Sequence, residues 1–486
     1  MKTHKGLILG ILAIAQFMVV LDASIVNVAL PAILRGLNFS PDNLQWVVTA
    51  YTLAFGGFLL FGGRAADLFG RRRTFLIGLV GFTVSSMIVG ASQNEVMMIV
   101  ARALQGLAAA FMSPAALSII LTEFREGADR NRALGVWSAV AAGGAAAGLL
   151  FGGVLTQYLG WRWDFFVNVP IGALLTVLAL RFVPEHGSEA EHNDLDLPGA
   201  VLVTAGLMAL VYGITKAPGW GWTSGQSLLW LGGATALLWL FIRNEASSKH
   251  PLMPLSIFRI RNLSGANMTQ LPITAAMFSM FFFISLYVQN ILGYSPVKTG
   301  VSFLPVTMII GITATITSRF IIKLGYKPFM VLAPLFIATG LFMLSHISVG
   351  GSYLTGVLPG ISILAFGVGM SFVAISIAAT SGVPQNESGL ASGLLNTAQQ
   401  IGGALGLAIL SGVAASKSKD VIVAAGQHAG DKLVIAQGTV AGFHSALLVG
   451  TGFALAASVI SLVLIRQPKP KGDAADPTGQ RLSSTI

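Results

Sequence analysis

The sequence predicts an all-α integral membrane protein, and three observations carry that prediction. Hydrophobic residues make up 54% of the 486-residue chain and charged residues only 10%, with a mean hydropathy of +0.77. A soluble domain would contain about 25% charged residues. Apolar runs of membrane-spanning length recur along the chain, and glycines in small-xxx-small spacing, such as Gly144, Gly148 and Gly152, suit helices that pack closely in lipid.

Fourteen apolar runs are long enough to span a membrane. A helix needs about 17–25 residues to cross a hydrocarbon core of about 30 Å. The first run is too long for a signal peptide and lacks a small-residue cleavage site after a short apolar core, so we expect an uncleaved helix. The runs lie near residues 7–30, 44–63, 74–92, 96–121, 133–159, 165–183, 199–215, 227–242, 263–292, 300–322, 329–346, 353–379, 390–415 and 441–465.

The basic residues predict which side of the membrane each loop faces. If the N-terminus is cytoplasmic, most of the 29 Lys and Arg residues fall in cytoplasmic segments, including residues 71–73 and the C-terminal tail. This positive-inside bias is expected of an even number of helices with both termini in the cytoplasm. The net charge of +10 is then a consequence of topology, and we expect no nucleic-acid partner.

The chain also repeats itself weakly. The segment from Arg64 to Arg72 recurs as the segment from Arg319 to Lys327, and Gly402 and Gly406 repeat the spacing of the glycines at 144 and 148. Two six-helix halves related as parallel repeats form the architecture of large secondary transporters. We therefore expect an N-terminal bundle over residues 1–183, a linker with two inserted transmembrane helices and a cytoplasmic loop over 184–262, a C-terminal bundle over 263–465, and a disordered cytoplasmic tail over 466–486.

Asp22 and Arg102 are single charges inside otherwise apolar runs. A lone charge in hydrocarbon costs several kcal/mol, so it indicates a water-filled path or a route for protons. At 1.5 Å per residue, Asp22 is expected about 12 Å and Arg102 about 9 Å from the outer ends of their helices. These two depths match, which makes the pair the best functional clue in the sequence.

Several motifs, in the same order along the chain, resemble the fourteen-helix drug:proton antiporter branch of the major facilitator superfamily. The resemblance covers almost the whole chain. It implies two six-helix bundles with two inserted helices, located in a bacterial inner membrane. The motifs are Leu21 to Pro31 on the first helix, Gly63 to Arg73 in the loop after the second, Arg102 to Gly106 on the fourth, Trp161 to Pro170 at the sixth, and Pro251 to Arg259 before the seventh.

In that family the first and fourth helices line the central cavity, so the resemblance implies that Arg102 sets the electric field at Asp22. Burial favours the neutral carboxyl, whereas a nearby guanidinium favours the carboxylate. A site balanced between the two effects can take up and release a proton near neutral pH. A static ion pair that only locks the helices together remains the alternative.

Uncharged polar residues are expected to support the cavity, because unpaired amides in lipid normally find partners across helices. The N-terminal half offers Asn27 and Gln105 for this role. The C-terminal half contains no carboxylate at mid-membrane depth, so any pocket there is expected to be neutral and polar. Its candidates are Gln270, Gln289, Asn396 and Gln399.

The cytoplasmic loop after the second helix suits a conformational latch. Gly63 allows close helix approach, and Asp67 can accept hydrogen bonds from a helix N-terminus or an arginine. The resemblance implies that this loop controls the conformational switch and does not touch the substrate. We carry that role over to Asp67, Gly70 and Arg71, and we assign helix packing to the fifth-helix glycines Gly144, Gly148, Gly152 and Gly153.

Two residues depart from the family pattern. Leu149 stands where the fifth helix usually has a proline, which puts the role of a proline kink in doubt because proline breaks a helical hydrogen bond. Asp164 follows Trp161-Arg162-Trp163 where an apolar residue is expected. Solvation or pairing with Arg162 is the simpler interpretation of Asp164, and an external carboxylate that meets cations is the other.

Together these features predict a proton-coupled transporter that exports lipophilic drugs or antibiotics by alternating access. We expect protons, membrane lipid and a lipophilic small molecule as partners, a monomer, no cofactor and no enzyme activity. The chain has no cysteine and contains no Walker motif for ATP and no HExxH metal motif. An importer of a metabolite remains the alternative, and a non-transporting receptor or scaffold is the alternative from another class.

Overall fold

The computed structural model describes residues 5–40, 43–124, 128–185, 196–249, 251–383 and 388–467. Most of the predicted disordered tail lies outside these ranges, as do residues 186–195 and 250 of the predicted linker segment. Within them the chain is helical and forms no strand. The prediction of an all-α membrane protein is therefore confirmed.

The N-terminal half forms six membrane helices, the last of which is divided into α6 and α7. The first helix runs to Gly36, six residues beyond the predicted end, and contains Pro31. The bounds are α1 Lys5–Gly36, α2 Trp46–Phe69, α3 Arg71–Gly90, α4 Glu95–Glu123, α5 Ala128–Tyr158, α6 Trp163–Phe166 and α7 Asn168–Phe182.

The inserted pair and the C-terminal half follow the predicted order. The inserted helices are α8 Leu197–Trp220 and α9 Gly225–Ser247. A short helix, η1 Leu255–Arg259, precedes the second bundle. This bundle contains α10 Arg261–Leu286 with η2 Tyr287–Ile291, α11 Pro296–Ser302, α12 Leu304–Leu324, α13 Lys327–Leu344, η3 Tyr353–Val357 with α14 Leu358–Thr380, α15 Ser388–Ala424, η5 Gly426–His428 and α16 Lys432–Leu464.

Thirteen helical segments of the described chain are long and apolar enough to cross a membrane, counting α6 with α7 and α11 with α12. Helix α5 is the remaining predicted span. It has 31 residues and contains no charged side chain between residues 133 and 158. The fourteen expected runs therefore all correspond to helices.

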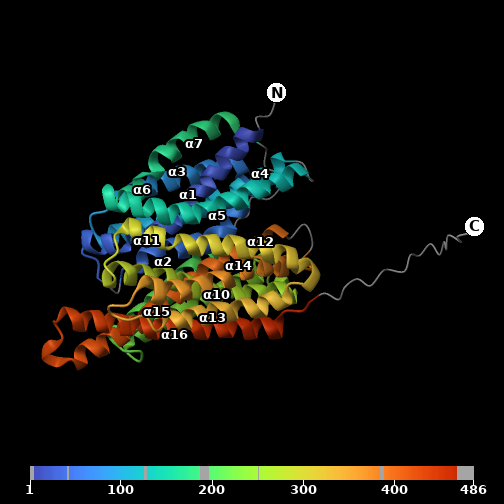
Figure 1. The fold of residues 1–486 in the computed structure, drawn as a ribbon. Helices are drawn as coiled ribbons and strands as arrows, with labels where there is room; N and C mark the ends of the chain where they lie inside the picture. Colours follow the sequence, from blue (N-terminus) through green and yellow to red (C-terminus); the bar gives the residue numbers. More distant parts are fainter. Residues whose placement is uncertain are drawn as a thin grey trace, which may run out of the picture.

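The two halves pack alike, as the sequence repeat predicts. In the N-terminal half, Gly144 of α5 lies against Phe17 and Val20 of α1. In the C-terminal half, Gly402 of α15 lies against Leu271 and Thr274 of α10. Figure 1 shows the two bundles side by side. Helix α5 of the first bundle packs against α11 and α12 of the second, and α2 packs against α15.

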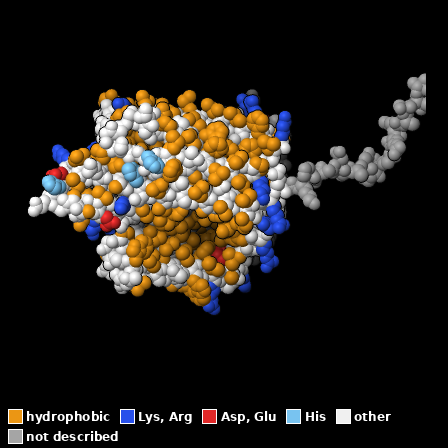
Figure 2. All heavy atoms as spheres, turned by 60° about the horizontal axis from the view of Figure 1, so that its bottom comes forward, with side chains coloured by type: hydrophobic (Ala, Val, Ile, Leu, Met, Phe, Trp, Pro, Cys, Tyr) orange, Lys and Arg blue, Asp and Glu red, His pale blue; other side chains and the backbone are white. Residues whose placement is uncertain are grey.

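The helices share two ends, which we name by their turns. The tail end contains the turns at Gly70 and Gly325 and the end of α16. Both glycines have positive φ, 95° and 74°, a backbone conformation that glycine adopts without steric cost. The far end contains the turns at Gly160 and Gly293. Lys and Arg side chains gather at the tail end, on the right of Figure 2.

Helices α15 and α16 extend past the other helices at the far end, where Figure 1 shows them as a protruding hairpin. The sequence predicted shorter spans because their outer turns are polar. The hairpin is held by close helix contact, since Gly438 lies against Ile422 and Gly442 lies against Ala414. Small residues at a helix contact allow this close backbone approach.

The inserted pair covers the seam between the halves. Helix α8 contacts α2 of the first bundle and α15 of the second. Gly57 of α2 lies against Thr204 of α8, and Gln45 Nε2 donates a hydrogen bond to Thr215 Oγ1 at 2.9 Å. The inserted helices therefore belong to neither bundle and join the two along one side.

Candidate functional site: a buried charged cluster

The structure brings Asp22 and Arg102 into direct contact. Asp22 lies near the middle of α1, and Arg102 lies two turns into α4 from the far end. Arg102 Nη1 donates to Asp22 Oδ2 at 2.5 Å, and neither side chain has exposed surface. The long arginine side chain accounts for contact between residues on different helices.

Arg102 is held by four kinds of group. Its Nε donates to the carbonyl of Val47 on α2 at 2.8 Å, and its Nη1 also donates to Gln105 Oε1 at 2.7 Å. The guanidinium carbon lies 4.3 Å from the ring centre of Tyr51 and 5.7 Å from that of Phe165. A guanidinium over an aromatic face is attracted by the ring quadrupole, so the charge is stabilised on several sides.

Asp22 receives three side-chain donors. Besides Arg102, Gln105 Nε2 donates to its Oδ1 at 2.7 Å and Asn168 Nδ2 donates to the same atom at 3.3 Å. Gln105 Nε2 also reaches Ser86 Oγ at 2.7 Å. Helices α1, α3, α4 and α7 are thus joined by hydrogen bonds. We call Asp22, Arg102, Gln105, Ser86 and Asn168, with Tyr51 beside the guanidinium, the charged cluster.

A buried ion pair of this kind is a weak source of stability. The cost of removing two charges from water offsets much of their attraction, whereas deleting one partner costs about 3–5 kcal/mol. The helices do not need the pair to pack, because apolar residues of equal volume would serve.

The resemblance placed this pair on the wall of a central cavity, but in this conformation it faces no open space. Helices α2, α3 and α7 enclose it. Asn27 also differs from expectation: its amide donates to Ala23 O at 3.2 Å and Ser24 O at 3.3 Å on its own helix, not across helices. It faces away from the pair because it lies five residues, about 140° of helical turn, beyond Asp22.

The polar residues of the C-terminal half take different places. Gln289 Nε2 donates to the carbonyl of Val28 on α1 at 2.9 Å, so it joins the two halves. Gln270 and Gln399 are half-buried, and Asn396 is exposed. The structure does not gather the four candidates into one neutral pocket.

Close backbone contacts seal the two halves at the far end. A Cβ on Gly153 of α5 would lie 2.6 Å from the carbonyl oxygen of Pro296 on α11, so only glycine fits there. Gly300 of α11 lies directly against the carbonyl of Leu149. Ser285 Oγ adds a hydrogen bond to the carbonyl of Asn27 at 2.6 Å. We call these contacts the outer seal.

Leu149 therefore occupies a packing position. Its side chain is buried and its carbonyl faces Gly300. Helix α5 runs without interruption through this position to Tyr158. The other three glycines, Gly144, Gly148 and Gly152, face α1 along the stretch that contains Asp22.

Comparison with known proteins gives the family. The sequence model of the Major Facilitator Superfamily matches residues 12–407. The chain belongs to this superfamily. It is 40% identical to a puromycin resistance protein of Streptomyces alboniger over 475 residues, covering 97% of this chain and 93% of that one. It is 38% identical to a cephamycin export protein of Amycolatopsis lactamdurans, with 86% and 87% covered.

Further relatives agree with this assignment. The chain is 35% identical to a multidrug resistance protein of Mycobacterium tuberculosis, covering 82% of this chain and 74% of that one. Among solved structures, a bacterial homologue of the human lysosomal transporter Spinster, in an inward-facing and unoccupied conformation, has a TM-score of 0.67 at 16% identity. It covers 96% of this chain and 100% of that chain, and it supports the fold of this major facilitator.

The tail-end loop of this transporter contains the residues assigned to the latch. Arg71 Nε lies 4.0 Å from Asp67 Oδ1, and Gly70 makes the turn between them. A Cβ on Gly63 would lie 3.7 Å from Pro114 Cβ, which is an ordinary contact with α4, so the prediction that Gly63 allows close helix approach is wrong. The close approach lies at Gly62, where a Cβ would collide with the carbonyl oxygen of Ala110. Arg72, which lies in the same motif but was not assigned to the latch, donates to the carbonyl of Leu180 at 2.5 Å and connects α3 to the end of α7.

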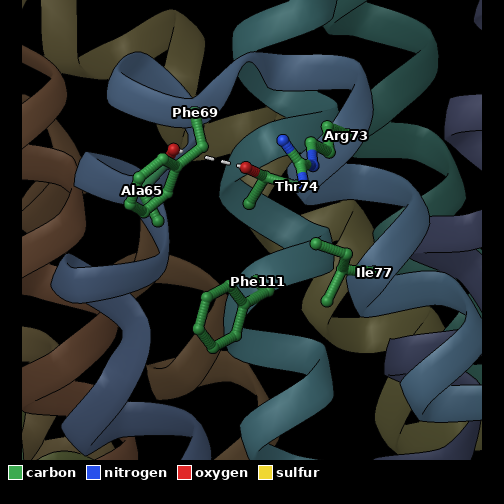
Figure 3. A pocket seen from close by; sticks show the side chains of 6 residues that line it. All are labelled: Ala65, Phe69, Arg73, Thr74, Ile77 and Phe111. Carbon is green, nitrogen blue, oxygen red and sulfur yellow. Dashed lines mark hydrogen bonds between the residues drawn. The ribbon is translucent and has the colours of Figure 1, made fainter.

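A small cavity of about 300 Å³ lies beside this loop, between α2, α3 and α4. Figure 3 shows its lining, with Thr74 turned toward Ala65, to whose carbonyl Thr74 Oγ1 donates at 3.3 Å. All of its lining belongs to one half, so a ligand here would not contact the second half. The lining residues are Ala65, Phe69, Arg73, Thr74, Ile77 and Phe111.

Three members of the charged cluster were not identified from the sequence. Ser86 and Tyr51 give little signal, because serine and tyrosine are common in membrane helices. Asn168 lies in the motif from Trp161 to Pro170, and an amide in an apolar run was a usable signal. Each joins the cluster through tertiary packing of helices far apart in the sequence.

Proposed function

We propose that this transporter exports lipophilic small molecules, antibiotics among them, in exchange for protons that enter through Asp22. The observation that carries the proposal is the fully buried Asp22–Arg102 pair in a chain that aligns nearly end to end with a puromycin resistance protein. A charge pair retained in a membrane bundle at a cost in stability indicates function.

The coupling follows from competition at the carboxylate. Proton uptake at Asp22 neutralises its charge and weakens the attraction to Arg102, which keeps its bonds to Val47 and Gln105. Because the cluster joins α1, α3, α4 and α7, loosening one bond changes how these helices pack. Protonation then favours one of the two conformations, open to the inside or open to the outside, because the proton binds them with different affinity.

We also propose how the protein is oriented and in which membrane it lies. We assign the tail end to the cytoplasm of a bacterial inner membrane, because basic side chains gather there and the positive-inside rule favours this orientation. The outer seal then closes the external side. Latch residues Asp67, Gly70 and Arg71 lie on the cytoplasmic side, where the halves must separate and close during each cycle.

The test is export from a pump-deficient bacterium that expresses the chain. Ethidium and puromycin should accumulate less than in cells without it, and a protonophore should restore accumulation. Asp22→Asn keeps the shape of the side chain and should abolish export while the protein remains in the membrane. Asp420→Asn, the same change at an exposed position near the end of α15, is the matched control.

Two outcomes separate the alternatives. Normal export by Asp22→Asn between pH 6 and pH 8 would identify the pair as a static lock and not the coupling site. Proton-driven uptake with no efflux of either compound would favour an importer. A protein that moves neither compound, yet binds one of them, would favour a receptor.

A further inference from the structure

A second buried carboxylate lies between the charged cluster and the far end. Asp164 on α6 has no exposed surface, and its Oδ2 accepts a hydrogen bond from Thr156 Oγ1 of α5 at 2.5 Å. Its Oδ1 is buried and has no hydrogen-bond partner among the described residues. The interpretation of Asp164 as solvated or paired with Arg162 is therefore wrong, because the side chain is buried and Arg162 donates to Ser92. A buried carboxylate with an unused acceptor is costly.

No cation neutralises Asp164 within the described chain. Arg162 instead donates to the carbonyl of Ser92 at 2.9 Å and stacks on the ring of Trp161. Helices α1, α3, α5 and α7 pack against α6. Among the charged and titratable groups of these four helices, Asp22 lies within the span and acts electrostatically on Asp164. The others lie near helix ends: Lys5, Arg35, Arg71, Arg72, Arg73, Asp129, Arg130, Arg132, Tyr158 and Arg181.

The geometry connects Asp164 to Asp22. Asp164 lies four residues after the Gly160 turn at the far end. Asn168 follows one turn later on the same face, because Val167 between α6 and α7 keeps helical backbone angles. Asn168 in turn donates to Asp22 at 3.3 Å.

Several buried polar atoms without a hydrogen-bond partner among the described residues belong to residues near Asp164, Asn168 and Asp22. The Oδ1 of Asn168, the hydroxyl of Tyr51 and the Nη2 of Arg102 are buried and have no hydrogen-bond partner among the described residues. Buried polar groups without protein partners are normally satisfied by internal water, which makes about three hydrogen bonds each. Together with Asp164 Oδ1, these atoms are suited to hold water between the two carboxylates.

We propose that Asp164 is a second proton-carrying side chain, which takes a proton from the far-end solution and passes it through buried water to Asp22. The Asp164 carboxylate gains a proton from water at the far end. Its O–H then donates to a bridging water, which gives one of its own protons to the Asp22 carboxylate. Asp164 returns to the carboxylate form, and water is neither consumed nor formed.

This inference rests on the proposed proton coupling, and the test separates the two. Purified protein in liposomes is titrated by infrared spectroscopy, which detects protonated carboxyl groups without any substrate. Asp164→Asn, which preserves shape and can still accept from Thr156, should lose one titrating carboxyl band that Asp22→Asn retains. Identical titrations of wild type and Asp164→Asn would overturn the inference whether or not the protein transports anything.

Transport in the same liposomes gives the second readout. With ethidium as the probe, Asp164→Asn should lose on the order of 100-fold in pH-driven flux, the effect of removing a positioned proton-transfer group. Exchange of ethidium without a pH gradient should remain as in wild type. Thr156→Val is the control: it removes the hydrogen bond but keeps the carboxyl, so coupling should persist with a shifted pH profile.

A structural role for Asp164 gives a different pattern. In that case Asp164→Asn and Thr156→Val would reduce pH-driven flux and gradient-free exchange by the same factor. That result would overturn the inference. Failure of wild type to move ethidium would count against the proposed function, and the infrared titration would still decide whether Asp164 carries a proton.

Discussion

The two six-helix halves of this transporter pack alike but differ in what they bury. Glycines on α5 and α15 face α1 and α10 in the same way, which aligns Asp22 with Ala276. Helix α14 takes the place of α4 in the C-terminal half and contains no charged residue, so nothing on it corresponds to Arg102. Ala276 is fully buried.

This difference indicates that the fold does not require the charges of Asp22 and Arg102. The C-terminal half reaches the same helix packing with uncharged residues where the N-terminal half keeps an ion pair. Since a buried pair contributes little net stability, the charges of the N-terminal half are best explained by chemistry. The C-terminal half instead contributes to the contact between the halves, where Gln289 donates a hydrogen bond to the carbonyl of Val28.

The largest effect is expected from making the N-terminal half resemble the C-terminal half. Asp22→Ala or Arg102→Ala alone leaves one buried charge without its partner and should destabilise the protein by about 3–5 kcal/mol. The double variant removes both charges and should lose less than either single change. Thermal unfolding of the purified proteins in detergent measures this order.

The double variant also sharpens the comparison functionally, since it should fold without exporting. Ala276→Ser, which adds one small hydroxyl at the aligned position of the other half, is the control for a changed buried residue. A double variant that still exports in a proton-dependent manner would contradict the assignment of coupling to this pair.

A smaller effect is expected at the contact between the halves. Gly153→Leu forces a side chain against the carbonyl of Pro296 and should cost about 1–3 kcal/mol in the sealed conformation. Export should slow because the outer seal no longer closes. Gly143→Leu is the matched control on the same helix, since a Cβ there meets nothing within 4 Å.

The rate of ethidium efflux from preloaded cells distinguishes the two leucine variants. Gly143→Leu should export as the wild type does. Equal efflux rates for Gly153→Leu and Gly143→Leu would mean that close approach of α5 and α11 is not needed in the transport cycle.

The smallest effect concerns the inserted helices, which belong to neither half. Single cysteines in this cysteine-free chain at Ser224 and Ser247 should leave export unchanged, because both lie at the ends of α9. A membrane-impermeant thiol reagent applied to intact cells should label Ser224→Cys, and Ser247→Cys should react only after the cells are opened. The reverse pattern would invert the proposed orientation.

The sequence by itself determined the class, the helix order and the identity of the two key charges. Long apolar runs can satisfy their backbone hydrogen bonds in lipid only as helices, so composition and length were sufficient for the spans. The cost of a lone charge in hydrocarbon was sufficient to single out Asp22 and Arg102. Helix ends such as Gly36 and Ala424 were missed, because polar turns outside the membrane carry no apolar signal.

Only the tertiary structure decided which groups surround those charges. Asn168, Ser86 and Tyr51 lie on three different helices, and their contacts depend on how those helices are rotated and packed. The same holds for Asp164, whose apparent partner Arg162 turns to Ser92 instead. Sequence patterns specify which side of a helix is apolar, but the direction of each polar side chain within a bundle is set by the neighbours it meets.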